Sequence, residues 1–204
     1  MDANSVKTRF APSPTGLLHL GNVRTALFNY LLAQRFSGQF LLRLEDTDAV
    51  RSEEKFEQAL QEDLLWLSLA WQEGPEKDGG NGPYWQSQRA SIYKEYFDKL
   101  LDQQQAYPCF CTEHELKMSR KAQLTAGKPP RYTGKCRGLS PDEVQAKFSA
   151  GQPSTLRFHV SDDSVISFED KVRGQQVYKG ADIGDFIIRR SDGTPAFFFC
   201  NAVD

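Results

Sequence analysis

The fold of this chain is decided by the stretch Arg9-Phe10-Ala11-Pro12-Ser13-Pro14-Thr15-Gly16-Leu17-Leu18-His19-Leu20-Gly21-Asn22. A short apolar run at 6–11 enters this turn-rich segment, and an amphipathic run with a period near 3.6 residues follows at 23–36. The pattern predicts a strand, a loop and a helix. The first N–H groups of such a helix lack intrahelical acceptors and lie at the positive end of its dipole, so the junction can hold a phosphate. His19 would stand at that phosphate, and Gly21, which lacks a Cβ, would let a ligand approach the backbone.

Each piece of this stretch also has an ordinary structural interpretation. A single histidine before a helix is often a cap or a surface residue, and residues 12–16 alone could be a common turn. Taken together, the residues resemble the first signature of class I aminoacyl-tRNA synthetases, in the form that glutamyl-tRNA synthetases carry: Arg-Phe-Ala-Pro-Ser-Pro-Thr-Gly, then His-Leu-Gly. Asn22 stands where many class I enzymes have a second histidine. The glutaminyl branch typically has Pro-Pro-Glu-Pro-Asn-Gly here, so the sequence favours the glutamyl branch.

Length, charge and cysteine usage narrow the class of protein. A chain of 204 residues is long for a single domain, which favours one domain with an insertion or two small ones. The balance of 25 basic against 27 acidic residues gives no overall nucleic-acid signature. We find no apolar run of about 18 residues and no secretory signal pattern, and therefore expect no membrane partner. Four cysteines, two of them as Cys-x-Cys, suggest thiols or metal ligands, and the cytoplasm as compartment.

A second strand is predicted where the chain leaves the first helix. Gly38 can end that helix, and residues 39–44 are mostly apolar, as in a buried parallel strand. Glu45-Asp46-Thr47-Asp48 then places polar residues at the carboxyl end of the strand, where open α/β sheets hold ligands. The alternative for Asp46 and Asp48 is an acidic turn that caps the next helix. In the resembled family the string Arg-x-Glu-Asp-Thr-Asp recurs, and its glutamate, here Glu45, is implied to meet the substrate α-ammonium group.

Two amphipathic helices are predicted next, as scaffold. Ser52 followed by two glutamates is typical of a capped helix start, and one buried face would be formed by Phe56, Leu60, Leu64 and Leu67. Packing is also the prediction for Trp66 and Trp71. The glycine- and proline-rich residues 74–83 predict a surface loop, and residues 86–101 a second helix. The string at 84–89 is similar to one in the family that borders the site, although no single residue in it receives a role.

Three cysteines and a tyrosine form a candidate metal site. Cys109, Cys111 and Cys136 are one ligand short of the usual tetrahedral structural zinc, and Tyr132, four residues before the third cysteine, could complete the set. Many members of the resembled family bind zinc here with a fourth His or Tyr, whereas others have lost the thiols. His114 is a weaker candidate for the fourth ligand. Without zinc, the cysteines would be small buried apolar residues.

The same region contains the one basic patch of the chain. Between residues 111 and 137 only two residues are acidic, Glu113 and Glu115, whereas seven are basic: Lys117, Arg120, Lys121, Lys128, Arg131, Lys135 and Arg137. Such a patch could lie along an RNA backbone without reading its sequence, or it could be a solvated arm. The segment 117–121, Lys-Met-Ser-Arg-Lys, imitates the second class I signature, Lys-Met-Ser-Lys-Ser. Because it lies between the candidate zinc ligands, we interpret it as a solvated helix.

The remaining residues predict a mixed α+β piece and then a return to the first fold. Ser140 as a cap and Pro141 at the first helical position predict a helix to about residue 150, and β-like runs at 155–160, 164–168 and 175–178 predict hairpins. Residues 185–204 resemble the re-entry of the family into its nucleotide fold. There the family lines its amino-acid pocket with an aromatic residue and an asparagine, at the positions of Phe197 and Asn201. Phe197 replaces the usual tyrosine, which shifts polar recognition to Asn201 and Arg9.

The resemblance covers essentially the whole chain and implies an α/β fold. The class would be the Rossmann-like nucleotide fold of class I synthetases with an inserted α+β acceptor-binding domain, incomplete in its second half. We expect the first half of the catalytic domain at 1–105, the insertion with a possible zinc arm at 106–184, and the start of the return at 185–204.

The chemistry that the resemblance implies needs no protein nucleophile. The α-carboxylate of L-glutamate would attack the α-phosphate of ATP, and the glutamyl group would then pass to the 3′ end of tRNA(Glu), with tRNA(Gln) undecided. His19, Gly21 and Thr15 would act at the nucleotide, with Mg²⁺ on the pyrophosphate. Arg9 suits a bidentate grip on the side-chain carboxylate, with Ser13 nearby. We expect a monomer, and we expect these 204 residues alone to be weak or inactive, because the family continues with further catalytic and anticodon-binding segments.

Two other functions are compatible with these motifs. The nearer is the shortened paralogue that activates glutamate without tRNA and attaches it to a modified base of tRNA(Asp), although its linker between the thiols tends to be shorter. The more distant is a non-catalytic nucleotide- or RNA-binding module that keeps the fold. Intact Arg9, His19 and Glu45 argue against the module.

Overall fold

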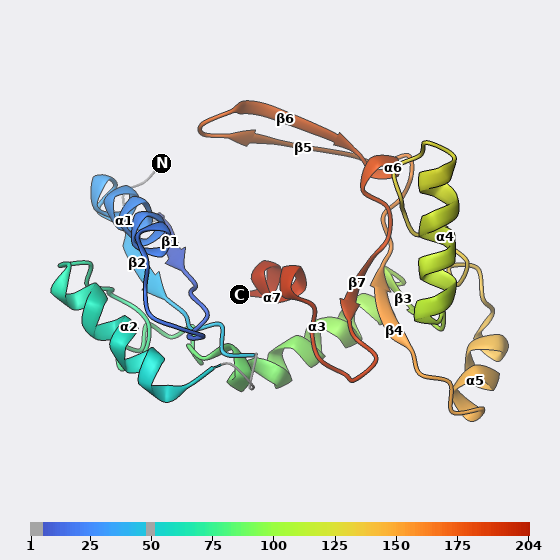
Figure 1. Ribbon diagram of the computed structural model, residues 1–204, viewed down its shortest axis with the longest axis horizontal. Helices are drawn as coiled ribbons and strands as arrows, with labels where there is room; N and C mark the ends of the chain where they lie inside the picture. Colours follow the sequence, from blue (N-terminus) through green and yellow to red (C-terminus); the bar gives the residue numbers. More distant parts are fainter. Residues whose placement is uncertain (1–5, 48–51) are drawn as a thin grey trace. The chain divides into compact units, whose positions relative to one another are not determined.

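The computed structural model describes residues 6–47 and 52–204, so that residues 1–5 and the predicted turn residue Asp48 lie outside the described residues (Figure 1). The chain divides into two compact units, one up to Ile92 and one from Tyr93 onward. The domain boundaries expected at 105 and 184 stay predictions.

The first unit is built on two parallel strands joined by a helix. Its first elements are β1 (Lys7–Phe10), α1 (Leu20–Arg35) and β2 (Gln39–Leu42). β1 and β2 pair in parallel along their whole length, which confirms the predicted strand, helix and strand. α1 begins three residues before the predicted position 23, because His19 occupies its N-cap. β2 ends two residues earlier than predicted, and Leu44 instead forms an isolated bridge with Trp85.

The next helix of the first unit packs as predicted but starts differently. In α2 (Glu54–Trp66) the side chains of Leu60 and Leu64 are buried in the core. The predicted cap Ser52 is wrong: Glu53 is the N-cap residue and makes no side-chain capping hydrogen bond. The predicted packing of Trp66 is also wrong, since 83% of this residue is exposed. Trp66 lies two positions beyond Leu64, which turns it to the opposite side of the helix.

The loop at 74–83 leads into two short helical segments. Before the loop, Trp71 is buried as predicted and its indole N–H donates to the carbonyl of Pro75 over 3.2 Å. The single predicted helix at 86–101 is divided into a 3-10 helix, η2 (Gln86–Arg89), and α3 (Ala90–Asp102). α3 carries the chain from the first unit into the second.

The second unit contains an antiparallel sheet, a separate hairpin and several helices. Its elements are β3 (Ala106–Cys109), α4 (Glu113–Thr125), α5 (Pro141–Ser149), β4 (Thr155–Phe158), β5 (Val165–Asp170), β6 (Gly174–Lys179), α6 (Gly180–Ile183), β7 (Phe186–Arg189) and α7 (Phe197–Val203). The sheet has the order β3-β4-β7, and β5 pairs with β6. The predicted hairpin is therefore confirmed for β5 and β6, whereas β4 pairs with β3 and β7.

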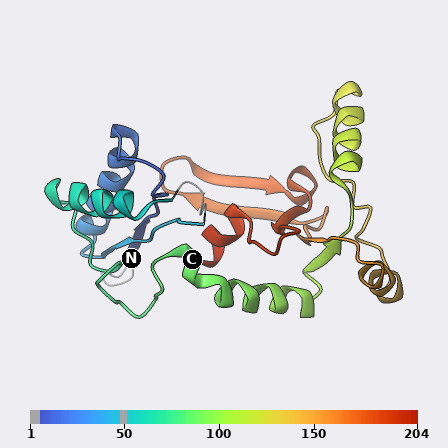
Figure 2. The same cartoon turned by 60° about the horizontal axis from the view of Figure 1, so that its bottom comes forward.

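The core of the second unit lies where α7 packs against α3. In the two views of Figures 1 and 2 these helices lie side by side, and the rings of Phe97 and Phe199 stack 4.5 Å apart. The hydroxyl of Tyr93 donates to the carboxylate of Asp204 over 3.0 Å. Ser140 caps α5 and Pro141 starts it, as the sequence predicts. The β5–β6 ribbon extends away from the sheet beside α6 (Figure 1).

Candidate functional site

The N-terminus of α1 is arranged around His19. Its Nδ1 accepts a hydrogen bond from the Gly21 N–H over 3.1 Å, and the His19 N–H donates to Asn22 Oδ1 over 3.4 Å. Because Nδ1 is an acceptor, the neutral ring carries its proton on Nε2, which can donate to an anion. The helix-cap interpretation of His19 is thus confirmed, and Asn22, the departure from the usual second histidine, takes part in the same cap.

Gly21 is required by the position of the His19 ring. A Cβ built on Gly21 would lie 2.8 Å from Cε1 and 3.0 Å from Nδ1 of His19, closer than real Cβ contacts. The missing side chain therefore makes room for the imidazole. The sequence instead predicted that it makes room for a ligand. Thr15 lies in the preceding turn, where its N–H donates to the Ser13 carbonyl over 2.9 Å, and both residues are exposed.

Glu45 is held beside the β1 strand by main-chain hydrogen bonds. The Glu45 N–H donates to the carbonyl of Pro12 over 2.9 Å, and the Arg43 N–H donates to that of Phe10 over 3.0 Å. The parallel pairing thus continues past β2, and Glu45 is buried at the carboxyl end of the strand pair. Arg9 lies on β1 opposite Leu41. The structure therefore places Arg9, Ser13 and Glu45 on two neighbouring segments.

A third segment, 84–87, completes the support of Glu45. Leu44 donates to the Tyr84 carbonyl and accepts from the Gln86 N–H, each over 2.9 Å. Asp46 accepts from the Ser87 N–H over 2.8 Å and from the Ser87 hydroxyl. The alternative interpretation, that Asp46 caps the next helix, is wrong, because its carboxylate instead accepts from Ser87 in η2. The sequence offered no role for Ser87, although its Tyr-x-Gln-Ser-x-Arg string gave a signal.

Phe197 and Asn201 lie in the second unit, on α7. Phe197 is the first residue of the helix and is 53% exposed, and Asn201 follows one turn later and is half-buried. Residues four apart lie on the same face of a helix, so this pair can line one surface. Its meeting with Arg9 and Glu45 stays a prediction.

The predicted metal ligands are brought together in the second unit. The sulfur atoms of Cys109, Cys111 and Cys136 lie within 4.8 Å of one another. The distance from Cys111 Sγ to Cys136 Sγ is 3.7 Å, and Tyr132 Oη lies 3.3 Å from Cys109 Sγ and 3.5 Å from Cys111 Sγ. His114 is exposed on α4 and is not among the clustered residues.

The separations of 3.3, 3.5 and 3.7 Å fit a tetrahedral zinc ion, and the remaining sulfur pairs lie within 4.8 Å. At zinc–sulfur and zinc–oxygen distances of about 2.3 and 2.0 Å, two sulfurs lie about 3.8 Å apart and a sulfur and an oxygen about 3.5 Å apart. Thiolate sulfur is also the ligand type that structural zinc prefers. The residues present are therefore compatible with three thiolates and the Tyr132 oxygen around one ion.

The pKa values of the Cys109 and Cys111 thiols are shifted in opposite directions. Burial would raise the pKa of Cys109, but its hydrogen bonds with Tyr132 and Arg157 outweigh this effect and lower the pKa to about 7. Burial and the neighbouring Cys109 raise the pKa of Cys111 to about 11. Burial, together with the hydrogen bonds to the thiols, raises the pKa of the Tyr132 hydroxyl. A bound dication would lower the pKa of each ligand, because metal ligands must be deprotonated.

Two charged residues near the cluster were missed at the sequence level. The guanidinium carbon of Arg157 lies 3.8 Å from the ring centroid of Tyr132. Asp185 is fully buried and accepts from the Val160 N–H over 2.9 Å, from the Tyr107 hydroxyl and from Arg137 Nη2 over 2.9 Å. Burial would raise the pKa of Asp185, but these donors hold it below its usual value. A buried charged residue in a strand is a signal only once the strand pairing is known.

Much of the predicted basic patch is paired with acidic residues, two of them within the patch and two distant in sequence. Four of its members form ion pairs, namely Lys117 with Glu113, Arg131 with Asp182, Lys135 with Glu115, and Arg137 with Asp185. Arg120, Lys121 and Lys128 are exposed and make no salt bridge within the described part of the chain. The imitation signature at 117–121 lies in α4, which has no buried residue, and the interpretation as a solvated helix is confirmed.

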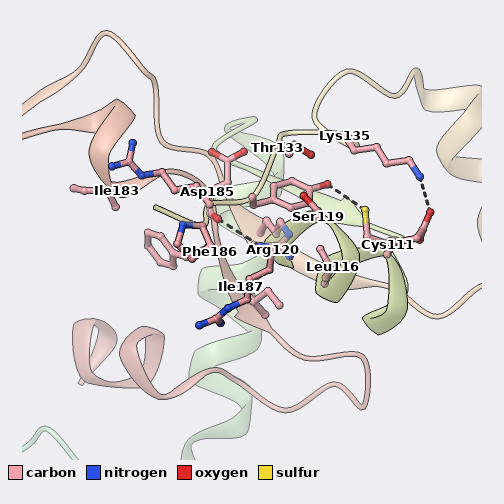
Figure 3. A pocket seen from close by; sticks show the side chains of 15 residues that line it. Cys111, Leu116, Ser119, Arg120, Thr133, Lys135, Ile183, Asp185, Phe186 and Ile187 are labelled. Atoms are coloured by element: carbon pink, nitrogen blue, oxygen red, sulfur yellow. Dashed lines mark hydrogen bonds and ion pairs between the residues drawn. The ribbon is translucent and has the colours of Figure 1, made fainter. Parts of the chain in front are cut away.

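A pocket of about 420 Å³ adjoins the thiol cluster. Figure 3 shows Cys111 and Lys135 on one side of it and Ile183 and Phe186 on the other. Arg120 and Asp185 also line the pocket, so that cationic and anionic side chains share its wall with apolar ones.

A comparison with protein families decides to which family this fold and these motifs belong. The catalytic domain of class I tRNA synthetases (E and Q) matches residues 5–204. The chain belongs to this family. Its mixed helices and strands are accordingly the Rossmann-like catalytic domain of a class I synthetase, as the sequence predicted.

Individual synthetases of this family are similar to the chain along its whole length. A glutamate–tRNA ligase of Coxiella burnetii (strain RSA 331 / Henzerling II) is 60% identical over 199 residues, which cover 98% of this chain and 43% of that protein. One of Nitrosococcus oceani is 60% identical over 204 residues, 100% of this chain and 43% of that protein. The chain therefore spans less than half the length of these curated relatives.

A solved synthetase has the same fold. The crystal structure of a glutamate tRNA ligase from Elizabethkingia meningosepticum CCUG26117, in complex with its amino acid, superposes with a TM-score of 0.87 at 36% identity. The match covers 98% of this chain and 41% of that one. In the described residues of the present synthetase domain, no helix is long and apolar enough to cross a membrane.

Proposed function

We propose that this domain belongs to an enzyme that activates L-glutamate with ATP and ligates it to tRNA. The observation that carries the proposal is the 60% identity to a glutamate–tRNA ligase over 98% of the chain. The motifs of the α1 junction and of Glu45 lie where the proposed chemistry needs them, at the carboxyl end of a parallel strand pair.

The proposed activation step depends on positioning and charge. The glutamate α-carboxylate attacks the ATP α-phosphate, and the bond to the pyrophosphate breaks. His19 Nε2–H donates to a phosphate oxygen at the start of α1, with Thr15 in the adjoining turn and Gly21 making room for the ring. When bound with ATP, Mg²⁺ would supply neutralising charge at the pyrophosphate.

Glutamate selection is proposed for five side chains that the family resemblance singles out. Arg9 grips the side-chain carboxylate, Ser13 adds a hydrogen bond, and Glu45 pairs with the α-ammonium group. Phe197 and Asn201, which lie one turn apart on α7, are proposed to contact the amino acid, as the family resemblance implies. Glutamine would leave the Arg9 guanidinium with a neutral partner, which is the physical basis of its rejection.

We further propose a structural zinc ion bound by Cys109, Cys111, Tyr132 and Cys136. The fit of the sulfur and oxygen distances to a tetrahedral ion supports this assignment. The ion would supply folding free energy to a region whose helices α4 and α5 have no buried residue. The protein side chains provide all four ligands, so the ion has no position open for catalysis.

The tRNA partner is proposed to contact the inserted residues 106–184, with 185–204 returning to the catalytic domain that residues 1–105 begin. Exposed Arg120, Lys121 and Lys128 supply the positive charge for this contact. We propose tRNA(Glu) as the main RNA substrate and leave tRNA(Gln) as a second candidate substrate. We further propose that the protein is a monomer and that it acts in the cytoplasm.

Glutamate-dependent exchange of pyrophosphate into ATP tests the activity, with and without total tRNA. It should be run on these 204 residues and on a chain of the length of the relatives. Exchange only in the presence of tRNA supports the proposal. Exchange without tRNA would favour the paralogue that modifies a tRNA base, and exchange in neither condition would favour a binding module.

A further inference from the structure

We propose that Arg157 is the positioning residue of the thiol cluster, holding the Tyr132 ring toward the ion and offsetting the negative charge of the ligand set. This role rests on the zinc site proposed above. It concerns a residue that contacts the ligands without being one.

The stacking geometry supports the first role proposed for Arg157, which is to hold the Tyr132 ring in place. The Arg157 guanidinium carbon lies 3.8 Å from the ring centroid of Tyr132, which places the planar group directly over the ring face. The Tyr132 hydroxyl at the other end of the ring accepts the Cys136 N–H over 3.0 Å and contacts two thiols. The ring is therefore held at its face and at its hydroxyl, and it has one orientation toward the sulfur atoms.

The charges around the cluster support the second role proposed for Arg157, which is to offset the negative charge of the ligands. Three thiolates and a zinc dication carry a net charge of about −1, and a phenolate ligand would make it about −2. Arg157 is only 6% exposed, whereas the side chain of Lys135 is 62% exposed and paired with Glu115. Arg137, the other nearby cation, is paired with buried Asp185. Arg157 is thus a buried cation beside the cluster, in a region of low dielectric where a charge acts more strongly than the exposed Arg120 and Lys135 do.

The contacts of Arg157 do not satisfy it without the cluster. Its Nη1 donates to the Asp185 carbonyl over a long 3.4 Å, and its Nε is buried with no hydrogen-bond partner among residues 6–47 and 52–204. A buried guanidinium with incomplete hydrogen bonding is destabilising on its own. An anionic ligand set beside it would compensate that loss.

The strand pairing explains why Arg157 points here. Arg157 lies on β4, opposite Tyr107 of the neighbouring strand β3. Cys109, the last residue of β3, lies two residues beyond Tyr107. On the other side of β4, the register with β7 shifts between Leu156 and Arg157. Such an irregularity redirects side chains locally, and bulges often occur next to sites.

Zinc affinity of variants tests the role, measured on the purified chain by competition with a chelator of known affinity. Arg157→Met removes the charge and the stack at similar length, and Arg157→Lys keeps the charge alone. We expect affinity to fall about 10- to 100-fold in Arg157→Met and less in Arg157→Lys. Lys135→Met, which removes a nearby but exposed charge, should change affinity less than about 3-fold.

Cobalt substitution gives a readout that is independent of affinity. The visible absorption of Co²⁺ reports the ligand set, and Arg157→Met should shift it toward the spectrum of Tyr132→Phe because the ring loses its support. If Arg157→Met does not fold, the shift is measured on Arg157→Lys. A wild-type spectrum and affinity in the Arg157 variants would overturn the role while leaving the zinc site intact. A wild-type chain that binds no stoichiometric zinc would overturn the zinc site and the role together.

Discussion

The α1 junction and the thiol cluster are built by opposite means. At the junction, main-chain hydrogen bonds place Glu45 and the segment 84–87, and His19, Ser13 and Thr15 remain exposed. In the cluster, the side chains themselves converge, with sulfur and hydroxyl groups 3.3 to 3.7 Å apart. A site for substrates that come and go needs a rigid frame with accessible side chains. A site for a permanent ion needs its ligands assembled and shielded.

The largest effect is expected from removing a cluster ligand. Cys136→Ser should abolish stoichiometric zinc and destabilise the second unit by about 4 kcal/mol or more, because loss of a structural metal is among the largest single-site losses. Zinc content and limited proteolysis measure both effects. Cys200→Ala, a change at a buried cysteine outside the cluster, should keep its zinc. Zinc retained in Cys136→Ser would contradict the assignment.

Next in size is the buried carboxylate beside the cluster. Asp185→Asn should destabilise by about 3 kcal/mol, because it leaves Arg137 beside a neutral partner. The folded-state pKa of Asp185 is lowered, so its stabilisation is present above its ordinary pKa and is lost as the pH falls through the folded value. Urea unfolding of Asp185→Asn should therefore depend less on acid pH than that of the wild type.

An exposed carboxylate at the same arginine provides the control. Asp162 lies 3.8 Å from Arg137 Nη1 with 66% of its side chain exposed. Asp162→Asn should change stability by less than about 0.5 kcal/mol. Equal losses of stability in Asp185→Asn and Asp162→Asn would contradict the prediction that the buried carboxylate contributes more than the exposed one.

At the junction, changes should affect activity more than stability. His19→Asn keeps an acceptor for the helix cap but removes the Nε2 donor. We expect glutamate-dependent exchange to fall about 100-fold, as for loss of one charge-stabilising donor, with stability changed by less than about 1 kcal/mol. His19→Ala should lose both activity and the cap. A fully active His19→Asn would contradict the phosphate-donor role.

Gly21→Ala should lower activity while changing stability little. Alanine favours a helix over glycine by roughly 0.5–1 kcal/mol, which offsets the loss of about 1 kcal/mol when the His19 cap is displaced. Its Cβ would lie 2.8 Å from His19 Cε1, which displaces the ring, and exchange should fall about 10-fold. In the His19→Asn background the same change should have little further effect.

The smallest effect is expected at the support of Glu45. Ser87→Ala removes one of two hydrogen bonds to Asp46 and should raise the KM for glutamate a few-fold, by about 1 kcal/mol or less, with kcat nearly unchanged. Asp46→Asn should act in the same direction, and the double variant should add little to either. A drop in kcat alone would contradict positioning through Glu45.

Periodicity and motifs in the sequence predicted the α1 junction well, but they predicted poorly which side chains are exposed and which surface charges are paired. The strand, helix and strand followed from short-range periodicity, and His19 and the cluster ligands from motif spacing. Trp66 and Trp71 are similar in sequence terms, yet one is 83% exposed and the other 4%. Composition cannot separate them, because Trp66 lies on the face of α2 away from the core, whereas Trp71 lies in the following loop and bonds to Pro75. The basic patch was overestimated for the same reason, since Asp182 and Asp185 approach it from distant residues.

The sequence by itself determined the α1 junction and the acidic strand end, and it predicted four candidate metal ligands. The junction and the strand end depend on residues close together in the chain, whose geometry is set by helix and strand periods. The candidate ligands come from two short motifs that only the fold brings together. Only the tertiary structure decided that Arg157 lies over Tyr132, that Asp185 receives Arg137, and that the Asp46 carboxylate accepts from Ser87 in η2. These contacts join residues brought together by strand pairing and packing, and no local period encodes which buried charge will face which partner.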